Sequence, residues 1–356
     1  TNANGCTNTA NVTVTVNQLP TAAIATVGAT TFCQGGSVTL LASNAPAGMT
    51  YTYQWRLNGT AITGATSNTY VANASGNYSV TITTNSGCAA TSAATTVTVN
   101  PLPVLAANTG SASVCENGTV TLANAQAGGL WSTANNTIAT INAVTGLVTG
   151  VNPGTTTLTY TFTNANGCTN SVSTNFTVNA LPAAVITANG STTFCQGGSV
   201  VLTANAGSSY LWSNGQTTQS ITVSNTADIT VTVTNANGCS ATSAITSVVV
   251  NALPVANITS LNGNSFCQGG SVTLVASNAS SYAWSNGAFT QSVTVSSTQT
   301  LTVTVTNANG CTATSAPFTV TMNPAPVATI TANGPTTFCA GGSVTLSAPA
   351  AASYLW

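Results

Sequence analysis

The sequence is almost free of charged side chains. It has one basic residue, two acidic residues and no histidine among its 356 residues. The three charges, Arg56, Glu116 and Asp228, lie in separate stretches of the chain, so they cannot form a carboxylate pair or a triad for general acid–base catalysis. Serine and threonine are plentiful, but a hydroxyl group without a neighbouring base is a poor nucleophile. These absences predict a protein that is not an enzyme.

The same absences exclude several ligands. With two carboxylates and no histidine, cysteine is the main residue type left to bind a metal, and no two cysteines have the CxxC spacing of a metal site. Affinity for nucleic acid depends on lysine and arginine, of which the chain has one. We therefore expect no cofactor, no metal ion and no nucleic-acid partner.

Long apolar runs are also missing. No stretch approaches the roughly 20 consecutive apolar residues of a membrane-spanning helix, and we expect no membrane insertion in this segment. Apolar residues nevertheless make up 43% of the chain, which argues against a disordered protein. They alternate with threonine, and this composition is typical of folded β-structure.

What the sequence does contain is internal repetition. Each repeat has a first cysteine in a phrase such as FCQGGSVTL, a tryptophan, and a second cysteine in a phrase such as TNANGC. The first cysteines are Cys33, Cys115, Cys195, Cys267 and Cys339. The second cysteines are Cys6, Cys88, Cys168, Cys239 and Cys311, and the tryptophans are Trp55, Trp131, Trp212, Trp284 and Trp356. The chain is therefore expected to consist of several copies of one small fold.

Short linkers with proline separate the repeats. In chain order they are VNQLP, VNPLP, VNALP, VNALP and MNPAP, and proline prevents a strand from running through them. We predict the tail of a preceding repeat at 1–18, complete repeats at 19–101, 102–180, 181–252 and 253–324, and the start of a further repeat at 325–356. The sequence is thus expected to be a window on a longer series of repeats.

Within a repeat the pattern is that of short β-strands. Residues 229–234 (ITVTVT) and 301–306 (LTVTVT) alternate strictly between apolar and polar, as in a strand with one buried face. The Asn-Ala-Asn-Gly phrase that follows each of them is typical of a hairpin turn. Such strands, with turns about every ten residues and no helical period, predict an all-β sandwich for each repeat.

The first complete repeat resembles an immunoglobulin-like domain. Residues 53–70 (YQWRLNGTAITGATSNTY) and 75–82 (SGNYSVTI) are similar to strands C to F of that fold, with a central tryptophan and with Tyr78 as a tyrosine corner. In this alignment Ala42 and Val80 occupy the positions of the usual disulfide between the two sheets. The resemblance implies small apolar packing at those positions and cysteines at the periphery of the domain.

The other repeats resemble related families. Residues 131–161 are similar to the bacterial Ig-like group 2 pattern, and 210–223 and 282–295 are similar to the short Ig-like and PKD-like repeats of giant Bacteroidota surface proteins. Those proteins include gliding-motility proteins and cell-surface adhesins exported by the type IX system. The resemblance implies tandem immunoglobulin-like β-sandwich repeats in an elongated rod, located outside the cell at its surface.

The cysteines of the complete repeats are expected to form structural disulfides, because no cysteine has a basic neighbour that would activate its thiol. One pairing closes each repeat on itself, and its bonds are Cys33–Cys88, Cys115–Cys168, Cys195–Cys239 and Cys267–Cys311. We favour this pairing because it is economical, and each loop would stabilise its repeat by about 4 kcal/mol.

A second pairing joins neighbouring repeats instead. In a simple sandwich the turns that hold the two cysteines of one repeat lie at opposite ends, about 20–25 Å apart, whereas a disulfide needs Cα atoms within about 7 Å. The bonds of this alternative are Cys33–Cys168, Cys115–Cys239 and Cys195–Cys311. Pairing within a repeat requires an irregular first strand that returns its cysteine to the other end, and the sequence leaves both pairings open.

The tryptophans are expected to fill the cores, because they recur at similar distances after the first cysteine. Those of the complete repeats are Trp55, Trp131, Trp212 and Trp284. Tyr210 lies two residues before Trp212, and Tyr282 two before Trp284, so each pair shares one face of a strand. The alternative is that these faces bind carbohydrate, with surface glycans as partners.

The predicted strands also have poorly protected edges. Natural sheet proteins guard edge strands with charges or proline, and strands such as ITVTVT have neither. A net charge near zero also removes the repulsion that keeps proteins apart. We therefore predict the structural repeat region of a long extracellular fibre or adhesin, acting by disulfide-stabilised stacking and self-association. The alternatives are a monomeric stalk that spaces a distal binding domain from the cell, and an array of carbohydrate-binding modules.

Overall fold

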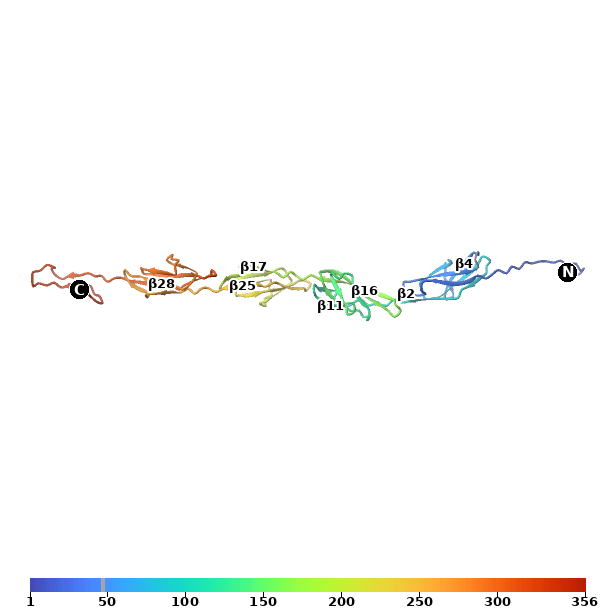
Figure 1. The fold of residues 1–356 in the computed structure, drawn as a ribbon, viewed down its shortest axis with the longest axis horizontal. Coiled ribbons are helices and arrows are strands. Elements are labelled where there is room, and N and C mark those ends of the chain that lie inside the picture. Colours follow the sequence, from blue (N-terminus) through green and yellow to red (C-terminus); the bar gives the residue numbers. More distant parts are fainter. Residues whose placement is uncertain (46–48) are drawn as a thin grey trace. The chain divides into compact units, whose positions relative to one another are not determined.

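The computed structural model describes residues 1–45 and 49–356, and every regular element in this part of the chain is a β-strand (Figure 1). The chain divides into two compact units, Thr1–Leu181 and Pro182–Trp356. Two separate hydrophobic cores lie in the first unit and two in the second. No helix among the described residues is long and apolar enough to cross a membrane.

The first core lies between two sheets. Their strands are β1 (Thr21–Val27), β2 (Thr31–Cys33), β3 (Val38–Ala45), β4 (Tyr51–Leu57), β5 (Thr60–Ala61), β6 (Thr69–Ala72), β7 (Gly76–Thr84), β8 (Ala89–Thr91) and β9 (Thr95–Asn100). One sheet has the order β1-β3-β6, and the other has the order β2-β9-β7-β4-β5, with β8 paired to β7. Ala42 and Val80, at the positions of the usual inter-sheet disulfide, are 4% and 0% exposed. Small apolar packing therefore replaces that bond.

The second core has its own pair of sheets. The strands are β10 (Ser113–Cys115), β11 (Thr119–Thr121), β12 (Leu130–Thr133), β13 (Ala139–Ile141), β14 (Leu147–Gly150), β15 (Gly154–Thr163) and β16 (Thr169–Asn179). They form sheets of order β10-β16-β15-β12 and β11-β14-β13. The long hairpin of β15 and β16 is paired from Gly154 opposite Val178 to Thr163 opposite Thr169.

The third and fourth cores share one topology. The strands around the third are β17 (Ile186–Asn189), β18 (Thr193–Cys195), β19 (Val200–Ala204), β20 (Ser209–Trp212), β21 (Ser220–Val223), β22 (Ala227–Ile229), β23 (Val231–Thr234), β24 (Ser240–Thr242) and β25 (Thr246–Asn251). Those around the fourth are β26 (Ile258–Ser260), β27 (Ser265–Cys267), β28 (Val272–Ala276), β29 (Ser281–Trp284), β30 (Ser292–Val295), β31 (Gln299–Leu301), β32 (Val303–Thr306), β33 (Thr312–Thr314) and β34 (Phe318–Asn323). In the third, the sheets are β17-β19-β21, β18-β25-β22 and β20-β23-β24, and the fourth repeats this order. The described residues after β34 contain one short pair, β35 (Thr331–Ala332) and β36 (Leu346–Ser347).

The first strand of a repeat crosses from one sheet to the other. β1 pairs antiparallel with β3, and β2 then pairs parallel with β9. The same change separates β17 from β18 and β26 from β27. A glycine with positive φ lies at each crossing, namely Gly28 (105°), Gly190 (124°) and Gly263 (84°). These backbone conformations favour glycine, so the crossing has a local sequence cause.

The sequence predicted one strand at 229–234 and one at 301–306. Each of these segments is instead divided into two strands. β22 pairs with β25, whereas β23 pairs with β20 and β24, and the break falls at Thr230. There the Thr230 N–H donates to the Ser213 hydroxyl at 3.1 Å, and the Val231 N–H donates to the Ser243 hydroxyl at 3.1 Å. Side-chain oxygens thus replace ladder bonds, and the strand can change partners while its alternation continues.

Candidate functional site

Four of the five first cysteines end a short strand that runs parallel to the last strand of the same repeat; they are Cys33, Cys115, Cys195 and Cys267. β2 pairs with β9, which places Cys33 opposite Asn100, and β18 pairs with β25, which places Cys195 opposite Asn251. The ladder continues one residue further, because the Gln34 N–H donates to the Asn100 carbonyl at 2.8 Å. Each of these cysteines therefore lies at the end of its repeat from which the chain leaves for the next repeat.

A tight turn with two glycines follows the first cysteine. The Gly36 N–H donates to the Cys33 carbonyl at 2.9 Å, and Gly35 has a φ of 93°. At Gly36, a Cβ atom would lie 3.1 Å from that carbonyl oxygen and 3.1 Å from Cδ2 of Phe32. Asn117 takes the place of Gly35 in the second core's repeat, and it also has a positive φ, of 62°. The FCQGG phrase thus fixes the turn that presents the cysteine.

The second cysteine closes a hairpin turn built around an asparagine. The Asn164 N–H donates to the Cys168 carbonyl at 2.9 Å. Oδ1 of Asn164 accepts from the N–H groups of Cys168 and Asn166, both at 3.0 Å. The same pair of side-chain bonds recurs around Asn235 and Asn307. The TNANGC phrase therefore forms a defined turn in which the cysteine has a fixed place.

Two disulfides join a first cysteine to the second cysteine of the following repeat. Cys33 is bonded to Cys168, with 5.5 Å between the Cα atoms, and Cys195 is bonded to Cys311, with 5.6 Å between them. Cys168 and Cys311 are both 0% exposed. Each bond therefore connects two different cores and is shielded from solvent on one side.

Hydrogen bonds between the asparagine turn and the linker accompany each disulfide. Nδ2 of Asn164 donates to the Pro101 carbonyl at 3.1 Å, and the Cys168 sulfur lies 3.8 Å from the carbonyl oxygen of Asn100. The corresponding contacts of the other junction are Asn307 to Ala252 at 2.9 Å and Cys311 to Asn251 at 3.9 Å. One asparagine thus orders the turn with its oxygen and holds the preceding linker with its nitrogen.

These bonds correct the pairing that we favoured from the sequence. The structure contains none of the bonds Cys33–Cys88, Cys115–Cys168, Cys195–Cys239 and Cys267–Cys311 within the described residues. The cause is the crossing of the first strand. Pairing within a repeat required an irregular first strand that returns its cysteine to the other end, but the crossing strand continues parallel to the last strand and takes the cysteine to the far end.

The remaining cysteines fall into two groups. Cys115 and Cys239 are both disulfide-bonded, whereas Cys6, Cys88, Cys267 and Cys339 are free thiols. Cys88 occupies a turn like that of Cys168, and its sulfur lies 3.8 Å from the carbonyl oxygen of Asn17. Cys267 lies opposite Asn323, as the other first cysteines lie opposite their asparagines. The turn that holds a second cysteine and the strand end that holds a first cysteine are therefore both formed where the cysteine makes no disulfide.

The tryptophans lie inside the cores. Trp55, Trp131, Trp212 and Trp284 are 0%, 6%, 1% and 4% exposed. The indole N–H of Trp212 donates to the Thr218 carbonyl at 2.7 Å. The Tyr210 hydroxyl is bonded to both backbone groups of Gly207, and the Tyr282 hydroxyl is bonded to both of Ala279. These rings pack within the fold, so they do not form an open aromatic platform for a sugar.

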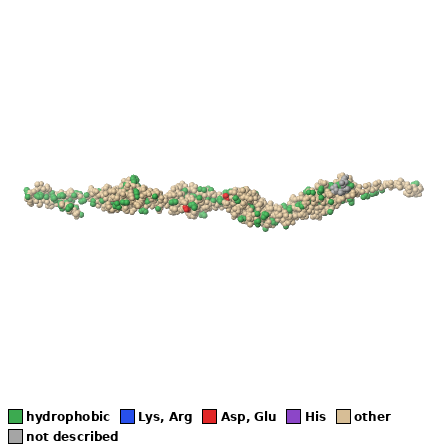
Figure 2. Space-filling view, in the orientation of Figure 1, with side chains coloured by type: hydrophobic (Ala, Val, Ile, Leu, Met, Phe, Trp, Pro, Cys, Tyr) green, Lys and Arg blue, Asp and Glu red, His purple; other side chains and the backbone are tan. Residues whose placement is uncertain are grey.

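Two of the three charged side chains, Arg56 and Asp228, bind close neighbours. The Arg56 side chain donates to the Thr81 hydroxyl at 3.1 Å, and the Asp228 carboxylate accepts from the Ser247 hydroxyl at 2.6 Å. On the face shown in Figure 2, nearly all visible side chains are apolar or uncharged. Within the described part of the chain, no three His, Cys, Asp or Glu side chains gather as a metal site would require. The candidate functional site is therefore the recurring arrangement in which a disulfide and an asparagine turn join two successive repeats.

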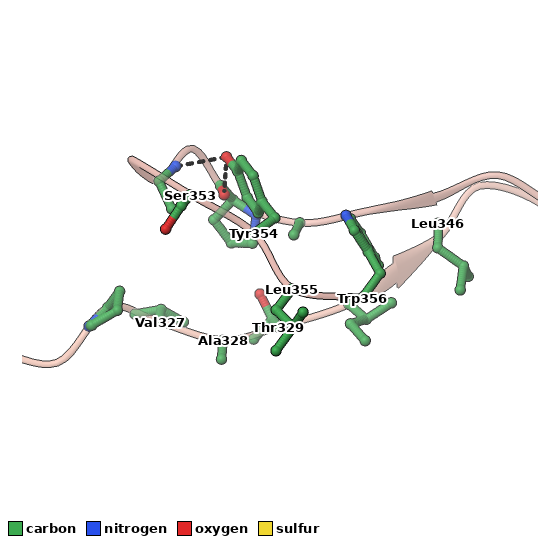
Figure 3. Close-up of a pocket in the computed structure, with 13 residues that line it drawn as sticks. Val327, Ala328, Thr329, Leu346, Ser353, Tyr354, Leu355 and Trp356 are labelled. Carbon is green, nitrogen blue, oxygen red and sulfur yellow. Dashed lines mark hydrogen bonds between the residues drawn. The ribbon is translucent and has the colours of Figure 1, made fainter.

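An open apolar cleft of about 560 Å³ lies within residues 326–356 (Figure 3). Val327, Leu346, Tyr354 and Trp356 are among its lining residues. Trp356 is 70% exposed, unlike the buried tryptophans of the four cores. The described strands of this region are only β35 and β36, and most of the residues that line the cleft lie outside them.

A family model gives an independent identification of the fold of the first repeat. The family is described as "Ig-like domain CHU_C associated", and its model matches residues 20–101. A comparison with curated proteins found no match. The described residues form sheets around four cores and contain no helix, and the chain is a series of immunoglobulin-like β-sandwich repeats.

Solved structures with a similar arrangement of strands are distant in sequence. A Ca²⁺-stabilised adhesin with which an Antarctic bacterium binds ice is 15% identical, with 86% of this chain and 100% of that chain covered and a TM-score of 0.30. The eight N-terminal Ig domains of the Down syndrome cell adhesion molecule are 16% identical, with 85% and 54% covered and a TM-score of 0.28. A C-terminal intimin fragment is 17% identical, with 47% and 65% covered and a TM-score of 0.25.

Proposed function

We propose that this chain is the structural repeat region of a long extracellular adhesin or surface fibre, in which disulfides hold successive repeats in a stack. The observation that supports this most directly is the bond between Cys33 and Cys168, which ties one repeat to the following one. The bond between Cys195 and Cys311 repeats that arrangement. Covalent restraint between neighbouring repeats suits an extended spacer, whose task is to keep its length and direction.

Cys115 and Cys239 are also disulfide-bonded. Their bonding supports a structural and not a reactive role for the cysteines of the repeats.

The extracellular location is supported by the same bonds. Disulfides persist in oxidising compartments and are rare in the reducing cytosol. Attachment to a cell surface and export by the type IX system are proposals that rest on the resemblance to Bacteroidota surface repeats. A catalytic role is not proposed, because the side chains of Arg56 and Asp228 bind neighbours within their own sheets.

Self-association is the finer part of the proposal, and the sheet edges support it. The outer strands β1, β6, β17, β21, β26 and β30 each end a three-stranded sheet. Their described residues include no charged side chain and no proline. An unpaired edge without charges is a template for pairing with another chain.

A lysine substitution on two edges tests this association. Thr222 in β21 and Thr294 in β30 are exposed, so Thr222→Lys with Thr294→Lys adds charge without disturbing a core. We expect the unaltered chain to form filaments or lateral assemblies at low and high salt, and the lysine variant to disperse. Sedimentation velocity and electron microscopy provide the measurement, and Thr222→Ser with Thr294→Ser is the matched control.

The outcome also separates the alternatives. An unaltered chain that stays monomeric at every protein and salt concentration would contradict self-association and favour a monomeric stalk. Saccharide binding by the oxidised full chain on a glycan array would favour carbohydrate-binding modules instead. Stacking itself is tested by electron microscopy of the oxidised and reduced chain, where reduction should broaden the distribution of angles between successive repeats.

A further inference from the structure

The disulfides shorten the covalent route through the chain. They connect residues that are 135 and 116 positions apart in the sequence. Between the end of one bond at Cys168 and the start of the other at Cys195 lie only β16, a linker, β17 and β18. Tension applied to the two ends of the chain can therefore pass from one bond to the other through a short stretch of backbone.

We propose that the disulfides form a covalent load path that keeps mechanical tension away from the inner strands of the repeats. The path consists of residues 1–33, 168–195 and 311–356, joined by the bonds Cys33–Cys168 and Cys195–Cys311. The remaining backbone lies in two loops that the bonds bypass. The biological use of such a path rests on the proposed stalk function, whereas the path itself follows from the bonds.

The strands on this path come from the beginnings or the ends of their repeats. They are β1, β2, β16, β17, β18, β33 and β34, with the short β35 and β36 beyond them. The bypassed loops contain the inner strands and the four buried tryptophans, which are Trp55, Trp131, Trp212 and Trp284. Once the path is taut, further pulling acts on the disulfides and not on the inner strands.

The bypass limits how far the chain can be stretched. An extended chain spans at most about 3.5 Å per residue, so the reduced protein could reach about 1,200 Å. The load path has roughly 100 residues and could reach about 350 Å. The difference of more than threefold is large enough for a direct measurement.

Cys115 offers a matched control. It lies inside the first bypassed loop, and Cys239 lies inside the second. Both are disulfide-bonded, but no route through them is shorter than the load path. Removing Cys115 therefore takes away one disulfide and leaves the maximum extension unchanged.

Single-molecule force spectroscopy on the full chain tests the proposal. The free thiols are first alkylated under oxidising conditions, and handles are attached to the two ends by peptide ligation. We expect a maximum contour length of about 350 Å for the oxidised chain and about 1,200 Å after reduction with dithiothreitol. Cys33→Ser and Cys168→Ser should each raise the oxidised value roughly twofold, and Cys115→Ser should leave it unchanged.

Two results would overturn the load path. One is an oxidised chain that extends as far as the reduced chain, and the other is a Cys115→Ser chain that lengthens as much as Cys33→Ser does. The proposed function is tested separately. A chain that assembles into fibres yet extends fully when oxidised would contradict the load path and leave the proposed function standing. A chain whose oxidised contour length stays near that of the load path, but which never assembles, would support the load path and contradict self-association.

Discussion

Cys33 lies opposite Asn100 in a parallel pair of strands, and its sulfur is bonded to Cys168 of the next repeat. Asn100 is the last residue of its repeat's final strand, and the linker begins directly after it. The cysteine is thus held beside the exit of the chain, where the turn around Asn164 of the following repeat lies against Pro101. The location of the bond follows from strand pairing in one repeat and turn geometry in the other.

Substitutions of Asn164 should show that its side-chain oxygen stabilises the turn and that its side-chain nitrogen binds the linker. Its Oδ1 accepts two backbone N–H groups, and its Nδ2 donates to Pro101. Asn164→Ala removes all three bonds and should lower local stability by about 1–3 kcal/mol. Hydrogen exchange at the amides of Cys168 and Asn166, followed by mass spectrometry, measures the loss.

Asn164→Asp is the control for that experiment. The aspartate keeps the acceptor oxygens for the turn and loses the donor to the linker, so exchange at Cys168 should stay slow while the linker after Pro101 becomes less protected. Equal exchange in the Ala and Asp variants would contradict the assignment of separate roles to the two ends of the amide.

Gly35 should tolerate asparagine better than alanine. Its φ of 93° is strained for residues with a Cβ atom, although no atom lies within 4 Å of the Cβ position. Asparagine adopts positive φ more readily than alanine does, and the chain itself has Asn117 at the equivalent place with a φ of 62°. We expect Gly35→Ala to destabilise the turn by about 1 kcal/mol and Gly35→Asn by less. The recovery of the Cys33–Cys168 bond after reoxidation is the measurement, and a lower yield for asparagine than for alanine would contradict the account.

Tyr78 should make the first repeat sensitive to alkaline pH. Burial, with a smaller effect of nearby Tyr70, raises the pKa of Tyr78 above its ordinary value of 10.0. Because the folded-state pKa is the higher one, the stability that the neutral phenol contributes is fully present below about pH 10. It is lost as the pH rises through the folded-state pKa. Denaturant unfolding at a series of pH values, together with tyrosinate absorbance, should show this loss.

Tyr78→Phe is the comparison for that titration. The substitution keeps the buried ring but removes the ionisation and the hydrogen bond to the Ala74 carbonyl, which is 3.0 Å long. We expect a cost of about 1 kcal/mol at neutral pH and a flatter decline above pH 10. An identical decline in both proteins would show that another group governs the alkaline transition.

The sandwich fold could be predicted because its signals are local. Strict alternation of apolar residues with threonine marks β23 and β32, and asparagine-glycine turns follow each of them. Small apolar residues at Ala42 and Val80 in place of a disulfide could also be inferred from the resemblance. These features depend on neighbours in the chain, which the sequence displays directly.

The disulfide pairing could not be settled because it depends on which sheet the first strand joins. The parallel pairing of β2 with β9 brings together residues far apart in the sequence, and the alternation of apolar and polar residues does not predict which strands pair. The one local signal was a glycine shortly before each first cysteine, such as Gly28 and Gly190, which have positive φ. In a chain with 31 glycines, those at the crossings do not stand out. The division of the strand at Thr230 was missed for a similar reason, since alternation continues across it.

The central claim is that the bonds join successive repeats, and peptide mapping without reduction tests it most directly. Pepsin is suitable, because the chain has one basic residue for trypsin and because acid suppresses the thiolate that drives disulfide exchange. We predict linked peptides that contain Cys33 with Cys168 and Cys195 with Cys311. Linked peptides that contain Cys33 with Cys88, or Cys267 with Cys311, would contradict the account.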